Sequence, residues 1–305
     1  FKDIGARFMA RMLSHFVSER TKQTNVLVAT SGDTGSAVAN GFLDVEGVHV
    51  HVLYPQGKVS ATQEAQFTTL GKNITALEIA GSFDDCQRLV KSAFLDNELN
   101  EKMILTSANS INVARFLPQS FYYFYAFAQL QKQEILNNKS LIFSVPSGNL
   151  GNLTAGLVAY KMGLPVKRFI AANNSNKVFY DYLNEGKYVP RPSIETVANA
   201  MDVGDPSNFF RILDLFNHSH EEIEYTIKSY TDSDKQIEDT IQKVYAQHSY
   251  LCDPHGACGF KALKDSIDKS EVGVFLETAH PAKFLETIEK TIGKGNVVVP
   301  ERLSE

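Results

Sequence analysis

The sequence has few cysteines, no long apolar run and no excess of positive charge. No stretch of 18 apolar residues occurs, so we expect no transmembrane helix. A formal net charge of −5 argues against a nucleic-acid surface. Three scattered cysteines indicate a reducing compartment rather than a disulfide framework, and the one cluster, Cys252 and Cys258 around His255, lacks the second group of ligands that zinc needs. These absences predict a cytoplasmic protein without a metal site, a membrane span or a nucleic-acid partner. A monomer or homodimer that acts on a small molecule is expected.

What is present is an alternation of short apolar runs with helical spacings. The 305 residues are enough for two domains. Strands are expected at 25–30, 49–55 and 103–110, and a second series begins with "SLIFSVPSG" and ends with "VGVFLETAH". Between the series a long helix is expected at 115–131, and 205–239 looks polar and helical. The pattern predicts an α/β fold with mainly parallel sheets flanked by helices, in two domains, 1–114 and 115–305.

Polar loops follow three of the expected strands. They read "TSGDTGS", "SANSIN" and "SGNLGN", and the last strand adds "ETAHPAKF" at its own end. In open parallel sheets, ligands bind beyond the carboxyl ends of the strands. We therefore expect these loops to supply the chemistry of one cleft.

The loop "SGNLGN" has the composition of an anion cradle. Gly148 and Gly151 allow close approach of the backbone, Asn149 and Asn152 carry amide donors, and a helical pattern follows at once. No lysine follows, so the loop is not the GxxxxGK[ST] nucleotide motif. It is not GxGxxG either, which argues against a dinucleotide-binding dehydrogenase. The loop suits one phosphate monoester, although a plain capping turn fits it equally well when it is taken alone.

Two further loops carry hydroxyls, amides and an arginine. Arg115 could hold a phosphate through two parallel hydrogen bonds, whereas Asp33 opposes an anion unless backbone N–H groups hold it. Two anion loops suggest one phosphate on a cofactor and one on a substrate. Pyridoxal phosphate is a cofactor with a single phosphate monoester, and it needs a lysine for its Schiff base, for which Lys2 is the candidate.

Seven stretches, in order over roughly residues 1–290, resemble the longer-chain branch of the threonine synthase family. That family contains fold-type II pyridoxal-phosphate enzymes related to threonine dehydratase. Its members carry a longer segment before the lysine, so the resemblance implies that part of the smaller domain precedes this sequence. The matching stretches are "FKDIGARFMARML", "TSGDTGSAVA", "LYPQGKVSATQE", "SANSINVAR", "VPSGNLGNLTAGLVAYKMGLPVKRFIAA", "NAMDVGDPSN" and "TAHPAKF".

The resemblance implies a carbon–oxygen lyase that converts O-phospho-L-homoserine and water to L-threonine and phosphate, the last step of threonine biosynthesis. Lys2 would form the Schiff base and act as the base, and Thr278 would face the pyridine nitrogen. The cofactor phosphate would lie on Gly148, Asn149, Leu150, Gly151 and Asn152. The groups around the substrate phosphate or carboxylate would be Ser31, Thr34, Asn109, Ser110 and Arg115.

Two alternatives remain open at this point. One is a related dehydratase or phospho-lyase that releases a 2-oxo acid. The other is an inactive phosphate-binding fragment. Asp33 departs from the asparagine that related enzymes often carry at this place, and an ionised carboxylate would repel the 3′-oxygen of the cofactor.

Overall fold

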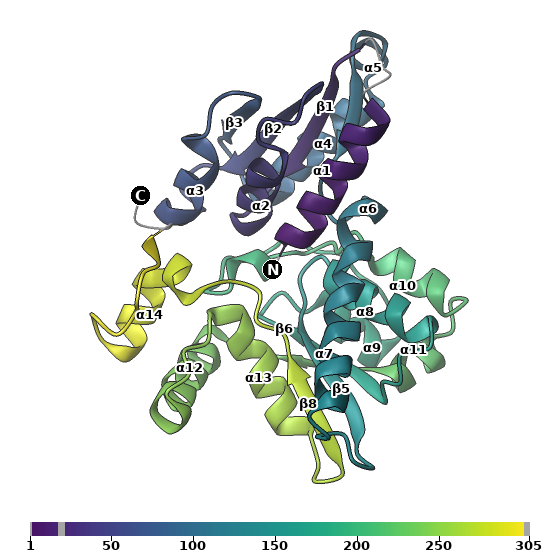
Figure 1. Cartoon of the computed structure of the whole chain (residues 1–305), viewed down its shortest axis with the longest axis vertical. Coiled ribbons are helices and arrows are strands. Elements are labelled where there is room, and N and C mark those ends of the chain that lie inside the picture. Colours follow the sequence, from purple (N-terminus) through teal and green to yellow (C-terminus); the bar gives the residue numbers. More distant parts are fainter. Residues whose placement is uncertain (1, 18–21, 302–305) are drawn as a thin grey trace. The chain divides into compact units, whose positions relative to one another are not determined.

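The computed structural model describes residues 2–17 and 22–301, and the chain divides into two compact units, Phe1–Pro118 and Gln119–Glu305. Each unit contains one four-stranded sheet in which every pairing is parallel (Figure 1). Helices connect the strands, as parallel pairing requires. The α/β fold predicted from the sequence is confirmed.

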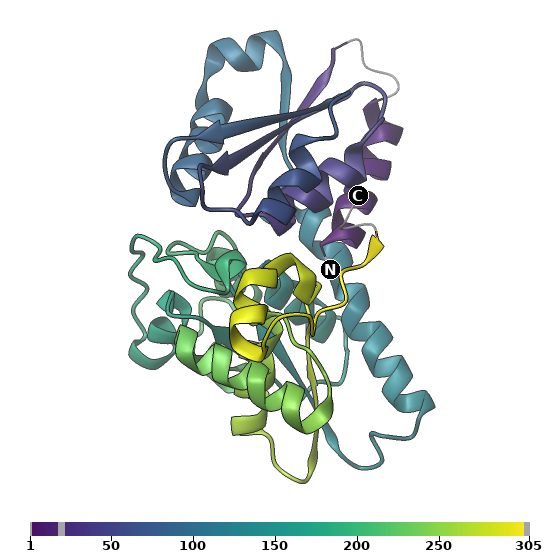
Figure 2. The same ribbon diagram turned by 90° about the vertical axis from the view of Figure 1, so that its left-hand side faces the viewer.

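The first unit has the strand order β3-β2-β1-β4. Alternate residues of β2 face opposite sides of its sheet, so Val50 and Val52 pack with α1, α2 and α3, while Leu53 packs with α4 (Figure 2). Its strands are β1 (Thr24–Ala29), β2 (Val48–Pro55), β3 (Ile74–Ile79) and β4 (Ile104–Ser107). Its helices are α1 (Asp3–Val17), α2 (Asp33–Phe42), α3 (Ala61–Thr68), α4 (Phe83–Leu95), α5 (Asn97–Lys102) and α6 (Val113–Phe116).

The helix expected at 115–131 is interrupted. Its sequence forms α6, the 3-10 turn η1 (Leu117–Gln119) and then α7 (Ser120–Lys132). Pro118 explains the break, because proline lacks the N–H that a continuous helix needs. The domain boundary expected between residues 114 and 115 falls inside α6, which packs against α1, and the compact units divide after Pro118.

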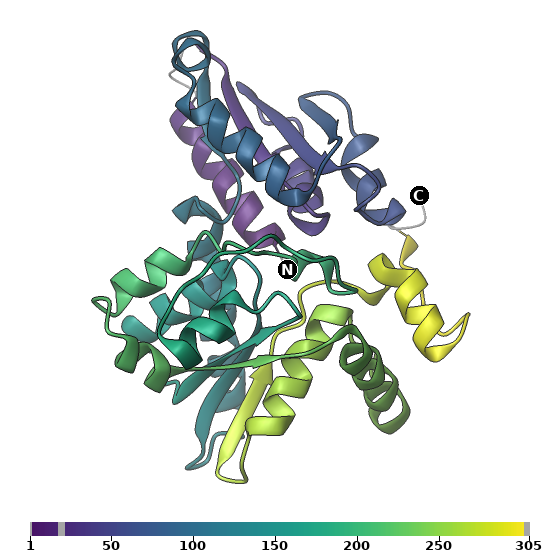
Figure 3. The same ribbon diagram turned by 180° about the vertical axis from the view of Figure 1, so that it is seen from behind.

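The second unit has the strand order β7-β6-β5-β8. Helix α13 lies along β5, β6 and β8, while Tyr123 of α7 packs on Phe143 and Phe169 of the opposite face (Figure 3). Its strands are β5 (Ser140–Pro146), β6 (Arg168–Asn173), β7 (Ile227–Thr231) and β8 (Glu271–Phe275). Its remaining helices are α8 (Gly151–Lys161), α9 (Val178–Glu185), η2 (Asn199–Met201), α10 (Phe209–Leu215), α11 (His220–Thr226), α12 (Asp234–His248), α13 (Pro254–Ser266), η3 (Pro281–Phe284) and α14 (Leu285–Ile292).

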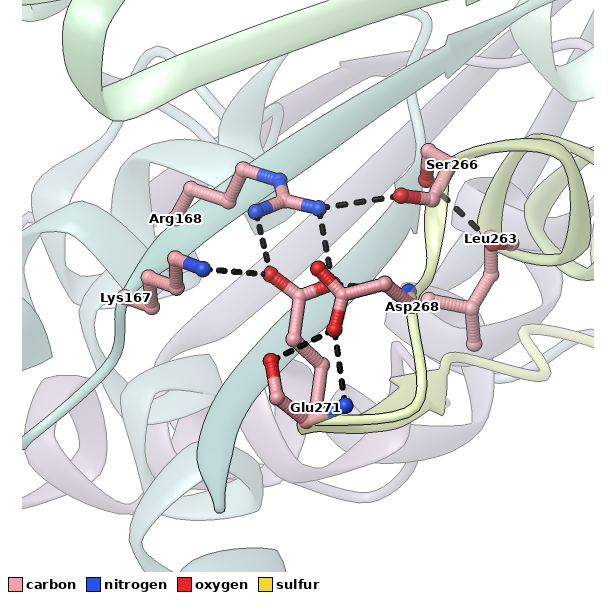
Figure 4. Close-up of polar contacts among 7 residues, drawn as sticks. Lys167, Arg168, Leu263, Ser266, Asp268 and Glu271 are labelled. Atoms are coloured by element: carbon pink, nitrogen blue, oxygen red, sulfur yellow. Dashed lines mark hydrogen bonds and ion pairs between the residues drawn. The ribbon is translucent and has the colours of Figure 1, made fainter.

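A buried carboxylate ties the strands together at the amino end of this sheet. The side chain of Glu271 is fully enclosed and accepts hydrogen bonds from Arg168 Nη1 at 2.6 Å, Arg168 Nη2 at 3.0 Å and Lys167 Nζ at 2.7 Å (Figure 4). Burial opposes its ionisation, but these hydrogen bonds outweigh burial and lower the pKa of Glu271 to about 2. The cluster anchors β8 and β6 at the edge opposite the loops that end the strands.

Candidate active site

In the second unit, β5 ends at Pro146 and α8 begins at Gly151, and the turn between them is the loop "SGNLG". Leu150 occupies the N-cap position of α8 in the left-handed region, with φ of 59°, and within the described chain its side chain makes no capping hydrogen bond. The first N–H groups of a helix have no partner inside the helix. The start of α8 therefore offers uncapped backbone donors to an anion.

Gly148 is packed so closely that no side chain fits at its position. A Cβ there would lie 2.9 Å from both the carbonyl oxygen of Ala200 and the Cα of Met201. Any larger residue would have to push η2 away from the loop. The segment 198–203, which we call the strap, thus forms a wall directly against residues 148–152, which we call the glycine loop.

Asn149 braces the loop. Its Oδ1 accepts hydrogen bonds from the N–H of Ser207 at 3.0 Å and from Ser207 Oγ at 3.2 Å. Asn208 Nδ2 donates to the carbonyl oxygen of Asn149 at 2.9 Å. These contacts fix the loop to the start of α10, a role that the sequence reasoning did not foresee.

Asn152 supplies the clearest sign of a missing anionic partner. The Tyr123 hydroxyl donates to Asn152 Oδ1 at 2.9 Å, which leaves Nδ2 as the donor of this amide. This Nδ2 is buried and has no hydrogen-bond partner among the residues that the structure describes. Buried donors in folded proteins are almost always satisfied. An oxygen atom of a phosphate at the start of α8 would satisfy this one, so the residues present fit the phosphate of the expected cofactor.

Thr278 lies in the segment that follows β8 and is half-buried. Backbone hydrogen bonds hold the chain on both sides of it: Leu276 N–H donates to Ser144 O at 3.0 Å, and Ala279 N–H donates to Asp253 Oδ2 at 3.3 Å. The hydroxyl of Thr278 is therefore presented by a segment with little freedom to move.

In the first unit, Lys2 and Arg115 lie together. The carbonyl oxygen of Lys2 accepts from Ala6 N–H at 3.2 Å, which starts α1, and from Arg115 Nη1 at 3.0 Å. Arg115 is buried, and its Nε donates to Ala108 O at 2.8 Å. The sequence suggested Arg115 as a phosphate ligand, and the structure adds that it fixes the backbone of the lysine.

The turn after β1 is built around Thr30. Its hydroxyl oxygen accepts the N–H groups of Gly32 at 2.9 Å and Gly35 at 2.7 Å, so it shapes the turn from inside. Asp33 is buried, and Gln63 Nε2 donates to its Oδ1 at 3.0 Å. Sequence reasoning missed this partner, which stabilises an acid at the start of α2. Ser31 and Thr34 flank it and are half-buried.

The loop after β4 meets the same turn through Asn109. Its Oδ1 accepts Ala29 N–H at 2.9 Å, and its Nδ2 donates to Ala29 O at 2.6 Å. These two hydrogen bonds extend the contact between the two chain segments beyond the last paired residues of β1 and β4. The next residue in the chain, Ser110, is half-buried. The structure thus brings Ser31, Thr34, Asn109 and Ser110 to neighbouring loops at the carboxyl end of one sheet.

The family model described as "Pyridoxal-phosphate dependent enzyme" matches residues 1–276, and the model "Threonine synthase, C-terminal" matches residues 256–305. The chain is 46% identical to the threonine synthase of Haemophilus influenzae, over 100% of this chain and 70% of that protein. It is 45% identical to the threonine synthase of Escherichia coli, over 100% of this chain and 69% of that protein.

Solved structures of threonine synthases also resemble the chain. The crystal structure of threonine synthase from Escherichia coli superposes with a TM-score of 0.92, covering 100% of this chain and 69% of that one. A structure described as PLP-bound threonine synthase from Brucella melitensis, 32% identical, gives a TM-score of 0.88 over 99% of this chain and 70% of that one. No helix within 2–17 and 22–301 is long and apolar enough to cross a membrane.

Proposed function

The chain belongs to the threonine synthases within the pyridoxal-phosphate-dependent enzymes, and on this premise we propose that it converts O-phospho-L-homoserine and water to L-threonine and phosphate. The family, the enzyme class and the cofactor predicted from the sequence are confirmed. The roles of individual residues are our proposal. It rests chiefly on the glycine loop, where an uncapped helix start and the unpartnered Asn152 Nδ2 fit a phosphate.

In this proposal the glycine loop, residues 148–152, holds the cofactor phosphate. Backbone N–H groups at the start of α8 and Asn152 Nδ2 donate to its oxygens, and the partial positive charge of the helix start favours its negative charge. Pyridoxal phosphate, when bound, supplies an electron sink that stabilises negative charge on the substrate carbons. The protein must then position the substrate and move protons.

Lys2 is proposed as the lysine that binds the cofactor and as the base. The substrate loses protons at Cα and Cβ and phosphate at Cγ, then gains a proton at Cγ, the hydroxyl of water at Cβ and a proton at Cα. The Nζ of Lys2 takes the proton from Cα, a step that a positioned amine performs well when its pKa is close to the working pH. Arg115 and Ala6 fix the carbonyl of Lys2, which reduces the freedom of the side chain at its root.

Thr278 is proposed to face the ring nitrogen of the cofactor. A hydroxyl at this place, rather than a carboxylate, leaves that nitrogen mostly unprotonated and restrains side reactions. Its neighbour Glu277 adds no negative charge there, because burial and the nearby Asp253 raise the pKa of Glu277 to about 10. The Glu277 carboxyl is therefore uncharged at pH 7.

The substrate phosphate or carboxylate is proposed to lie on the loops of the first unit. Hydroxyls and amides from two neighbouring strand ends can donate to several oxygens at once, and a guanidinium adds charge. The enzyme would then discriminate against compounds that lack the phosphate, because these donors would be left without hydrogen-bond partners. The residues proposed for this role are Ser31, Thr34, Asn109, Ser110 and Arg115.

Lys2→Ala tests the proposal. Wild-type protein incubated with pyridoxal phosphate and reduced with borohydride should carry the adduct on the peptide that contains Lys2, and Lys2→Ala should carry none. Threonine and 2-oxobutyrate are then assayed with O-phospho-L-homoserine. The proposal is supported if the wild type forms threonine and Lys2→Ala forms none. A 2-oxo acid as the main product would assign a lyase reaction instead, and normal turnover by Lys2→Ala would remove Lys2 from the chemistry.

A further inference from the structure

We propose that the buried pair Asp253–His255 is a positioning pair, which holds the strap against the glycine loop and at the same time holds the segment that carries Thr278. The pair lies at the start of α13. This inference rests on the proposed function, because it concerns the two segments assigned there to opposite ends of the cofactor. All the contacts that carry it lie within the second unit.

Both nitrogens of the His255 ring are in use. Nδ1 lies 2.5 Å from Asp253 Oδ1 and donates its hydrogen to that carboxylate. Nε2 accepts a hydrogen bond from the backbone N–H of Ala200 at 3.1 Å. A nitrogen that accepts carries no hydrogen, so the ring hydrogen that this geometry requires lies on Nδ1. The ring is 1% exposed, which shields this arrangement from water.

The contact to Ala200 reaches the glycine loop through one further step. The carbonyl oxygen of Ala200 and the Cα of Met201 are the atoms that press on Gly148. His255 therefore holds the backbone N–H of Ala200. The carbonyl group of the same residue forms part of the wall against Gly148. Without this acceptor, the N–H of Ala200 would face a buried site with no partner, and the strap could move away from Gly148.

The other oxygen of Asp253 reaches the second segment. Oδ2 accepts Ala279 N–H at 3.3 Å, next to Thr278, while Oδ1 also accepts His255 N–H at 2.8 Å and so caps α13. One carboxylate thus contacts the strap through His255 and the Thr278 segment directly. This sets the spacing between the phosphate cradle and the threonine hydroxyl.

The local electrostatics keep this carboxylate charged. Burial by itself would raise the pKa of Asp253, but His255 and the start of α13 favour its ionised form and bring the pKa below its usual range. Glu277 takes the opposite state, with a pKa raised to about 10 by burial and by Asp253. Two buried acids therefore carry one negative charge, which is the charge that the hydrogen bonds of Asp253 require.

The competing explanation is that the pair only stabilises the fold. A buried histidine–aspartate pair that caps a helix stabilises a protein wherever it occurs. The two explanations differ in the cofactor. Loss of general stability leaves the affinity of the folded protein for pyridoxal phosphate unchanged, whereas loss of positioning weakens it and changes the surroundings of the phosphate.

The test uses His255→Leu, which removes both ring contacts, and His255→Asn, which keeps a donor for Asp253 but is too short to reach Ala200. His255→Gln serves as the conservative variant, because its amide oxygen can accept from Ala200. The matched control is His220→Leu, which loses a histidine hydrogen bond to the backbone of the same unit, at 3.0 Å to Tyr182 O, a contact that involves neither the strap nor Asp253. Each protein is titrated with pyridoxal phosphate, and the ³¹P resonance of the bound phosphate is recorded.

We expect His255→Leu and His255→Asn to bind pyridoxal phosphate about tenfold more weakly, the effect of one lost buried hydrogen bond, with a shifted ³¹P resonance. His255→Gln should recover most of the affinity, and His220→Leu should match the wild type. Unchanged affinity and resonance in the His255 variants, or an equal loss in His220→Leu, would overturn the inference. If the wild type itself forms no adduct on Lys2, the proposed function fails instead, so the two failures are distinct.

Discussion

Glu271→Gln is the substitution whose cost can be worked out most directly from the structure. The side chain of Glu271 is fully enclosed, and its carboxylate receives two hydrogen bonds from Arg168 and one from Lys167. An amide of the same size loses the charge and turns one acceptor into a donor that faces a cation. Packing is preserved, so the measured change reports the interaction itself.

Two estimates of the stability lost in Glu271→Gln agree. Removing one partner of a buried ion pair costs about 3–5 kcal/mol, and the partial exposure of Arg168 and Lys167, 17% and 46%, favours the lower end. The pKa of Glu271 lies at about 2 instead of 4.5, and at 1.36 kcal/mol for each unit this corresponds to about 3 kcal/mol. Since the pKa is depressed, this stability is fully present above pH 4.5 and is lost as the pH falls through about 2.

Urea unfolding followed by far-UV circular dichroism measures the change. Glu271→Gln should unfold with about 3 kcal/mol less free energy than the wild type at pH 7, and the difference should shrink to less than half near pH 3. The control Glu238→Gln breaks an exposed pair with Lys290 and should cost at most about 1 kcal/mol. A loss below about 1 kcal/mol for Glu271→Gln, or a difference that does not depend on pH, would refute the reasoning.

Two further substitutions test the site. Arg115→Lys keeps the charge, but one ammonium cannot replace a guanidinium that donates to the carbonyl oxygens of Lys2 and Ala108. We expect kcat/KM for O-phospho-L-homoserine to fall by at least tenfold, about 1.4 kcal/mol. Kinetics equal to those of the wild type would remove Arg115 from the site. Glu277→Gln removes a group whose pKa is raised from 4.5 to about 10, so that the wild type loses stability as the pH rises through this range. Urea unfolding at pH 7 and pH 9 should show the wild type losing up to about 3 kcal/mol more than the variant, and parallel losses in both proteins would contradict this assignment.

Much of the fold was predictable, because buried parallel strands leave a strong pattern. The run before Pro146 is almost wholly buried as β5, and its glycine turn and helix follow where the sequence predicts them. Strand β7 was missed, since 205–239 was read as helical. Only Ile227 of this strand is fully buried, and it lies at the edge of the sheet, so pairing with β6 decides its conformation rather than its own composition.

The candidate site was predictable only in part. The sequence named the loops, because glycine, asparagine and hydroxyl residues after a strand carry a recognisable chemistry. It did not name the partners that hold them, such as Tyr123 for Asn152, Gln63 for Asp33 and His255 for the strap. These contacts join residues far apart in the chain, and no local pattern in the sequence marks them.

The carboxylate cluster around Glu271 has a consequence for protein engineering. It lies at the amino ends of β6 and β8, whereas the glycine loop and the Thr278 segment follow the carboxyl ends of β5 and β8. Resistance to heat and affinity for the cofactor can therefore be selected in separate libraries, one for each edge of the same sheet. Substitutions collected at the amino edge should combine additively with those at the other, since the two groups share no partner.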